Sequence, residues 1–295
     1  MIGIRRFCLC AIAIALLLTN GCASRTYRFG NPERSFAIRQ LQGFKVTIGG
    51  EHPKLDRIER TVHYPVKKLK QWFGKDKSPK PSDDFQRALA LRQSQEYLAL
   101  NQLHDVRIDV REYSPAEQWR RLKENDSISP FWKYTTGTLQ HVEYCLMPGR
   151  VFHRDHYNVF TNTLSLNSTQ PEQSLYTAAT AKYLRSKKHP GAFSSACYMP
   201  IVPLYRDYYV ANDVLSYARF REDWQTEKLL YPQIYGSFGG DLVSQATSLV
   251  PGLAYLPFYV KPVLTAGGRI GGSATGNLVL KQREKENGST ASVTE

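Results

Sequence analysis

The stretch Phe160-Thr-Asn-Thr-Leu-Ser-Leu166 and the segment that follows it decide the fold. Its aromatic, β-branched and leucine residues predict a sheet strand. Pro171-Glu172 then begins a predicted helix, because proline is favoured in the first helical turn, and this helix runs to about Lys188, just before Pro190-Gly191. A strand joined to a helix in this way indicates an α+β fold.

Further helices and another strand are predicted upstream. Val106-Arg-Ile-Asp-Val-Arg-Glu-Tyr113 alternates apolar and charged residues, which is typical of a half-buried strand. Asp83 or Asp84 can cap a helix that ends near Gln102, and Ser114-Pro115 opens another, with serine at the cap. The body is therefore predicted to be predominantly helical, with a small sheet.

The C-terminal region is predicted to be helical and rich in glycine. A long helix is expected from about Pro203 to Leu230, and the apolar region Tyr231 to Gly276 contains small residues that let helices pack closely. Residues 242–260 carry no charge and match a membrane span in length, but prolines interrupt them. A packed helical hairpin is therefore favoured over an integral membrane helix. The polar residues 281–295 are expected to form a disordered tail.

Residues 1–21 have the layout of a secretion signal. Arg5 and Arg6 precede an apolar run from Phe7 to Leu18. This run has twelve residues, whereas roughly 20 are needed to cross a bilayer as a helix. Cleavage and export are therefore expected.

Cys22 is the predicted site of a lipid anchor. Gly21 directly before it resembles the lipobox of bacterial lipoproteins, in which the cysteine thiol receives a diacylglycerol, although Thr19 stands where leucine is usual. Acyl chains hold a protein firmly on a membrane. Ordinary signal cleavage near Gly21 or Ser24 is the alternative.

Cys145 and Cys197 are the two cysteines left in the folded part of the chain. An oxidising envelope would permit a disulfide between them. Two buried free thiols are the alternative, and the sequence gives no distance that decides between them.

The chain is strongly basic, with a net charge of +13 over 295 residues, and it stays basic without the signal. No RNA- or DNA-binding motif accompanies this charge, so nucleic acid is not the expected partner. In an exported protein the charge favours anionic lipid or an anionic polymer. Residues 22–82 are predicted to form a basic extension, irregular as far as Lys80, that spaces a single domain over 83–280 from the membrane.

Four motifs in the body occur in an order shared with a known group of proteins. They are Trp119-Arg-Arg-Leu, Trp132-Lys-Tyr-Thr-Thr-Gly-Thr-Leu, Met147-Pro-Gly-Arg-Val-Phe and Asp155-His-Tyr-Asn-Val-Phe-Thr-Asn-Thr-Leu-Ser-Leu. Over roughly Phe85 to Gly276 the chain thereby resembles uncharacterised bacterial envelope proteins, mainly planctomycete-like, with a zincin-like metallopeptidase domain. The resemblance implies a strand followed by a helix that carries His-Glu-x-x-His, whose histidines bind Zn²⁺ while the glutamate activates water.

The metal-binding residues of that family are absent from this chain. Aligning Ala181-Lys182 with the family's Ala-Lys places Tyr176 and Thr180 at the two histidines and Thr177 at the glutamate, and the third ligand falls near Tyr208. Neither Tyr nor Thr replaces imidazole as a stable zinc ligand. The resemblance thus implies a degenerate metallopeptidase without metal or cofactor, in which these tyrosines and Thr180 hydrogen-bond one another.

Two other groups of residues are functional candidates. His153, Asp155 and His156 are close enough in sequence to bind a metal or supply a general base, although a polar turn is the simpler interpretation. Zinc peptidases bind substrates by adding an extended peptide to a sheet edge, and the strand over 160–166 is the predicted groove. Its candidate contacts are Tyr157, Asn158, Phe160 and Asn162. The alternative is that these residues only order the strand and its turn.

The sequence therefore predicts an exported, lipid-anchored, non-catalytic zincin-like protein of the cell envelope. Its predicted partners are the membrane and an envelope protein, peptide or anionic polymer, on the periplasmic or exterior side. Two alternatives stay open. One is an active hydrolase that uses His153, Asp155 and His156, and the other is an integral membrane protein through 242–260.

Overall fold

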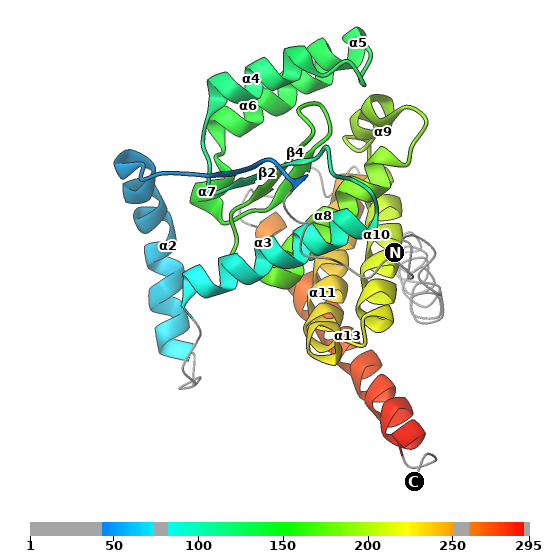
Figure 1. Cartoon of the computed structure of the whole chain (residues 1–295). Coiled ribbons are helices and arrows are strands. Elements are labelled where there is room, and N and C mark those ends of the chain that lie inside the picture. The colour runs from blue at the N-terminus through cyan, green and yellow to red at the C-terminus, as the bar shows by residue number, and fades with distance from the viewer. Residues whose placement is uncertain (1–42, 74–81, 250–259, 292–295) are drawn as a thin grey trace. The chain divides into compact units, whose positions relative to one another are not determined.

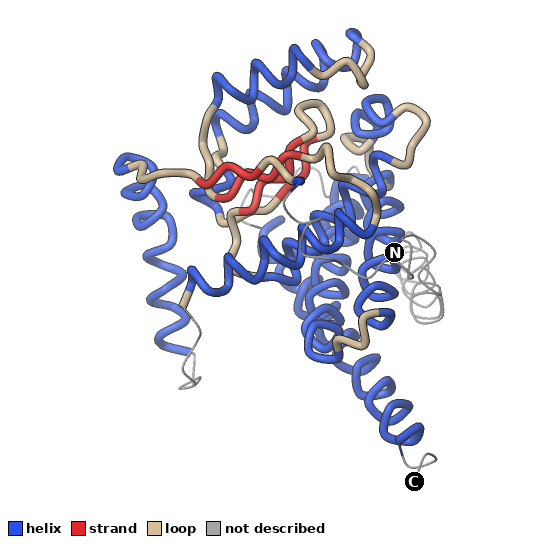
Figure 2. Tube along the Cα trace, in the orientation of Figure 1, coloured by secondary structure: helices blue, strands red, loops and turns tan. Residues whose placement is uncertain are grey.

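The computed structural model describes residues 43–73, 82–249 and 260–291. These residues divide into two compact units, with the boundary between Val202 and Pro203. The first unit holds a small sheet and its helices, and the described part of the second is helical (Figure 1; Figure 2). The predicted α+β, predominantly helical class is confirmed. The boundary falls inside the single domain predicted over 83–280, and Cys22 and the predicted signal lie outside the described residues.

The sheet has four strands in the order β1-β2-β4-β3. The first three of these run parallel to one another, and β3 is antiparallel to β4. Because β4 has a neighbour on each side, the edges of the sheet are β1 and β3. The strands are β1 (Val46–Ile48), β2 (Arg107–Val110), β3 (His156–Asn158) and β4 (Thr163–Leu166).

Helices lie on both faces of this sheet (Figure 1). α3 and α8 pack against each other and against β4, whereas α4 lies on the other side. Successive side chains of a strand point to opposite faces. Asp109 accepts a hydrogen bond from Gln118 on α4, so its side chain points to the α4 side of the sheet. Its neighbour Ile108, and Leu164 opposite Ile108 on β4, are buried on the other side, toward α3 and α8. The helices of this unit are α2 (Pro53–Phe73), α3 (Asp83–Leu100), α4 (Pro115–Glu124), α5 (Pro130–Trp132), the π-helical η2 (Lys133–Gly137), α6 (Thr138–Leu146), α7 (Gly149–Phe152), α8 (Pro171–Arg185) and α9 (Pro190–Ala196).

The predicted irregular extension is wrong where the structure describes it. β1 lies within 22–82 and pairs with β2, with Val46 opposite Ile108, and α2 follows it. β1 is too short to show an alternating pattern in the sequence. α2 is rich in charged residues, so its few apolar residues do not stand out.

The starts of α3 and α4 differ in how they are capped. Ser82, not Asp83 or Asp84, caps α3, because its hydroxyl accepts a hydrogen bond from the amide of Phe85 at 3.3 Å. The two aspartates occupy the first turn, where negative charge is favourable. Ser114 stands at the predicted cap position of α4, but its side chain makes no capping bond.

The second unit contains α10 (Val202–Phe220), α11 (Trp224–Leu249) and α13 (Val260–Ala291). The single helix predicted from Pro203 to Leu230 is in fact two helices, which separate where Glu222 adopts a positive φ of 52°. α11 and α13 pack together, as the predicted hairpin requires.

α13 also corrects the predicted tail. It continues through Ala291, so residues 281–291 are helical rather than disordered. The guanidinium of Arg283 donates to the carboxylate of Glu227 on α11 at 3.3 Å, which ties this part of the helix to its neighbour. None of the helices in the described residues combines the length and the apolar composition of a membrane span, and residues 250–259 lie outside the described part.

Candidate functional site

α8 carries the predicted degenerate metal positions. The hydroxyl of Thr177 donates to the carbonyl of Gln173 at 2.9 Å, and that of Thr180 donates to the carbonyl of Tyr176 at 3.0 Å. Both bonds lie within the helix, one turn back. Thr180 therefore bonds to the backbone of Tyr176, and Tyr208 belongs to α10 of the second unit.

Asp155 is a buried structural anchor. Its carboxylate accepts hydrogen bonds from the hydroxyls of Ser168 and Ser174, each at 2.7 Å, and from the amides of Asn167 and Ser168. Burial raises the pKa of Asp155, and these donors act to lower it. The contacts fix the chain between β4 and α8.

The two histidines beside Asp155 have separate surroundings. His153 Nε2 lies 2.6 Å from Glu59 Oε1, and its ring lies against that of His63, with centroids 4.4 Å apart and the two planes tilted by 35°. Burial lowers the pKa of His156 to about 4, so this imidazole is neutral near pH 7. His153 and Asp155 bond to different partners, and among the described residues the three candidates form no group that could hold a metal.

The candidate groove residues order the turn between β3 and β4. The phenol of Tyr157 donates to Asn162 Oδ1 at 2.8 Å, and Asn158 Oδ1 accepts from the amide of Phe160 at 2.9 Å. The Phe160 side chain is fully buried, and Asn162 donates to the carbonyl of Asp105. The strand over 160–166 is therefore not the free sheet edge that the prediction requires, because β4 is paired on both sides and Phe160 and Asn162 precede it.

Cys145 and Cys197 are both free thiols, so the structure contains no disulfide between them. Cys145 Sγ lies 3.7 Å from His141 Nε2 on the same helix. Burial raises the pKa of the thiol and lowers the pKa of the imidazole. Both groups are thus held neutral, unlike an activated cysteine nucleophile.

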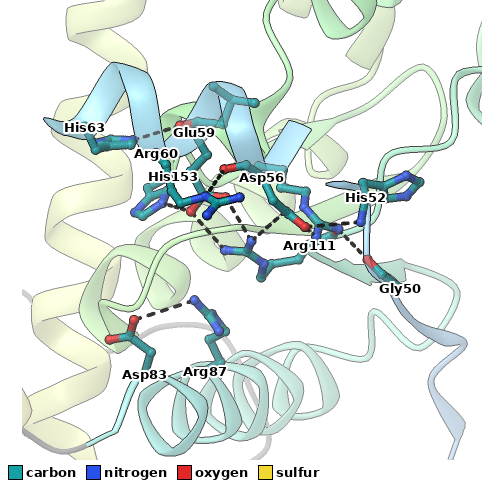
Figure 3. Close-up of polar contacts among 12 residues, drawn as sticks. Gly50, His52, Asp56, Glu59, Arg60, His63, Asp83, Arg87, Arg111 and His153 are labelled. Atoms are coloured by element: carbon teal, nitrogen blue, oxygen red, sulfur yellow. Dashed lines mark hydrogen bonds and ion pairs between the residues drawn. The ribbon is translucent and has the colours of Figure 1, made fainter. Parts of the chain in front are cut away.

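A polar network that the sequence did not predict attaches α2 to the body (Figure 3). We call it the α2 clamp, and it consists of Asp56, Glu59, Arg111, Arg150 and His153. Arg150 donates to Asp56 Oδ1 at 2.8 Å and to the carbonyl of Arg111 at 2.9 Å. Arg111 donates to Glu59 Oε2 at 3.0 Å. α2 is therefore fixed to the sheet unit.

The two carboxylates of the α2 clamp are held in their charged form. Burial acts to raise the pKa of Asp56 and of Glu59, but the hydrogen bonds and charges of Arg150, Arg111 and His153 together lower both. Asp56, Glu59, Arg60 and His63 recur three and four residues apart. That polar stripe was the signal in the sequence. Across the described residues, no group of three or more His, Cys, Asp or Glu side chains could hold a metal ion.

An exposed apolar surface is the largest remaining candidate for binding. It follows the helical stretch α5–η2–α6, and we call it the α6 face. Leu139, Val142 and Leu146 recur three and four residues apart, so they share one side of α6. The π-helical turn adds one residue, which brings Tyr134 onto that side. The side chains of the α6 face are Phe131, Tyr134, Leu139, Val142, Leu146 and Met147.

Comparisons with family models, curated proteins and solved structures gave no match to this chain. The resemblance to zincin-like envelope proteins therefore stays a prediction.

Proposed function

We propose that this chain is an exported, lipid-anchored protein of the bacterial envelope with a degenerate zincin-like body that binds a partner without catalysis. The state of α8 carries this proposal. Thr177 and Thr180 stand where the resemblance requires glutamate and histidine, and each hydroxyl is bonded to its own helix. Neither group is arranged to activate water.

The order of elements supports the zincin-like part of the proposal. An antiparallel β3–β4 pair leads directly into α8, which packs on α3. The resemblance implies the same succession of strand and motif-bearing helix. Asp155 fixes the connection between them through its serine partners, so its carboxylate is committed to structure.

The anchor rests on the N-terminal sequence, in which basic, apolar and small residues lead to Cys22. Intact mass of the mature protein tests it. We expect a diacylglyceryl cysteine at the N-terminus, loss of that mass in Cys22→Ala, and no change in Cys10→Ala, whose cysteine lies inside the signal. An unmodified cleavage product would leave export without the anchor.

The absence of catalysis is tested by metal analysis and peptidase assays on the purified, lipidated protein. We expect no stoichiometric zinc and no hydrolysis that a chelator suppresses. Stoichiometric zinc together with chelator-sensitive hydrolysis would refute the proposal. Hydrolysis that survives the chelator but disappears in His153→Gln would instead favour the alternative hydrolase.

A further inference from the structure

Exposed apolar side chains concentrate on and beside the α6 face. Of the 22 large hydrophobic side chains exposed in the described residues, nine lie on this face or in the short segment after α9. This segment lies beside α6, because the Tyr198 phenol donates to Glu143 Oε2 at 3.0 Å. Leu146 is 75% exposed and Phe131 is 65% exposed. The three additional residues are Tyr198, Met199 and Ile201.

The α6 face carries almost no charge. Within 130–147, Glu143 is the one exposed charged side chain, and the Tyr198 phenol bonds to it. Lys133 is buried, and its ammonium donates to the carbonyl of Lys123 at 3.1 Å. Burial lowers the pKa of His141, so this imidazole adds no charge. Removing the face from water therefore desolvates few ionic groups.

The composition of the face matches a helix that lies in a membrane interface. Such helices bury Phe, Leu and Met side chains at the boundary between headgroups and acyl chains, while tyrosines sit at headgroup level. Exposed Arg154 influences Tyr198 electrostatically. This cation suits anionic headgroups, as does the net charge of the chain, which stays positive without the signal.

The N-terminal sequence places a bilayer within reach of the face. Twenty residues separate Cys22 from Gly43, the first described residue, which belongs to the same unit as α6. In any conformation twenty residues span at most about 70 Å. A lipidated Cys22 would thus hold Gly43, in the unit that carries the α6 face, within about 70 Å of a membrane surface.

We propose that the α6 face docks on the anionic lipid surface of the bilayer that holds Cys22. Leu146 and Met147 enter the boundary with the acyl chains, and Tyr134 and Tyr198 lie at the headgroups. The inference rests on the lipid anchor of the proposed function, and it adds a second, non-covalent contact between the folded body and the membrane.

Quenching of tryptophan by brominated lipid tests the docking. The full lipidated protein is reconstituted on vesicles of phosphatidylethanolamine and phosphatidylglycerol with brominated acyl chains. Leu146→Trp places a reporter on the face, and Phe85→Trp is the control, since Phe85 is 59% exposed on α3 of the same unit. We expect the emission added by Leu146→Trp to fall at least about twofold while that of Phe85→Trp is unchanged, and we expect a smaller effect on phosphatidylcholine alone.

The outcomes separate the docking from the anchor. Intact mass that shows a lipidated Cys22, with no quenching at Leu146→Trp, overturns the docking and leaves the anchor standing. If Cys22 is unmodified, the mature protein is mixed with the same vesicles, and quenching there supports the docking while its absence overturns it. Crosslinks between copies through Leu139→Cys, found without quenching, would assign the face to self-association and also overturn the docking.

Discussion

The sheet unit and the α11–α13 pair differ in the closest contacts that hold them together. In the sheet unit, buried charges meet specific partners, and Arg121 donates to Asp109 at 2.6 Å although both side chains are at most 5% exposed. In the helical pair, backbones touch where side chains are absent. A Cβ on Gly268 would lie 2.5 Å from the carbonyl oxygen of Gly239, and one on Gly276 would lie 2.6 Å from that of Tyr231.

This difference means that the two regions should respond to different changes. Losing a partner of a buried charge should damage the sheet unit, because the remaining ion stays desolvated. Adding a single methyl group should damage the helical pair, because tightly packed backbones cannot move apart without losing contact. The same difference predicts that the response to pH arises mainly in the sheet unit.

The largest expected effect is that of Arg121→Met. Asp109 would remain buried without its cation, and breaking such a pair costs about 3–5 kcal/mol in the free energy of unfolding. Arg120→Met is the matched control, because the neighbouring Arg120 is 53% exposed and pairs with Glu117 and Glu124 at the surface. Urea unfolding followed by circular dichroism measures both. Equal losses in the two variants would contradict the role given to the buried pair.

The next largest effect is that of Gly272→Ala in α13. The new methyl group would collide with the carbonyl oxygen of Tyr235 and lie 3.1 Å from the Cα of Gly236. We expect a loss of about 2–3 kcal/mol, seen as faster hydrogen exchange in α11 and α13. A Cβ on the adjacent Gly271 would have no neighbouring atom within 4 Å. Gly271→Ala should therefore stabilise the helix by about 0.5–1 kcal/mol. Destabilisation by both would show that the helix pair is not packed in this register.

A pH effect of about 2 kcal/mol is expected from His156, since the folded protein disfavours its charged form. Its folded pKa of about 4 lies below the ordinary value of 6.5, so its contribution is complete above pH 6.5 and is lost as the pH falls toward 4. The raised carboxyl pKa values of Asp109 and Asp155 act in the opposite direction. The measurement is therefore the difference between parent and variant.

His156→Gln should flatten this part of the stability profile, measured as the unfolding free energy at pH 7, 5.5 and 4.5. His189→Gln is the control, because His189 is exposed. If the stability profile of His156→Gln is as steep as that of the parent protein, burial of this imidazole does not control the profile.

The sequence predicted best where the pattern was long and local. α3, β2, α4 and α8 lie where capping residues, alternation or proline indicated them. β1 and α2 were missed, because β1 gains its order from pairing with β2, and α2 is attached by the α2 clamp. Such partners are far apart in the sequence: Asp56 and Arg150 differ by 94 positions.

The candidate sites were less predictable than the fold. His153, Asp155 and His156 look like a cluster because they are close in sequence, but His153 ends α7 in a left-handed conformation and only His156 belongs to β3, so the chain turns between them. Asp155 takes serine partners near α8, whereas His153 reaches Glu59 on α2. The α6 face was also missed, because exposure depends on what packs against a helix and a pattern alone cannot show which side stays uncovered.

The smallest expected effect is that of Ser82→Ala at the start of α3. The Ser82 hydroxyl accepts the amide of Phe85, and losing a serine cap costs about 1 kcal/mol. Ser114→Ala removes the same group from the same position of α4, where no capping bond exists, and should change stability by much less. The pair isolates one hydrogen bond within the sheet unit. Equal losses in both variants, measured by thermal unfolding, would mean that the cost comes from helix propensity rather than from the cap.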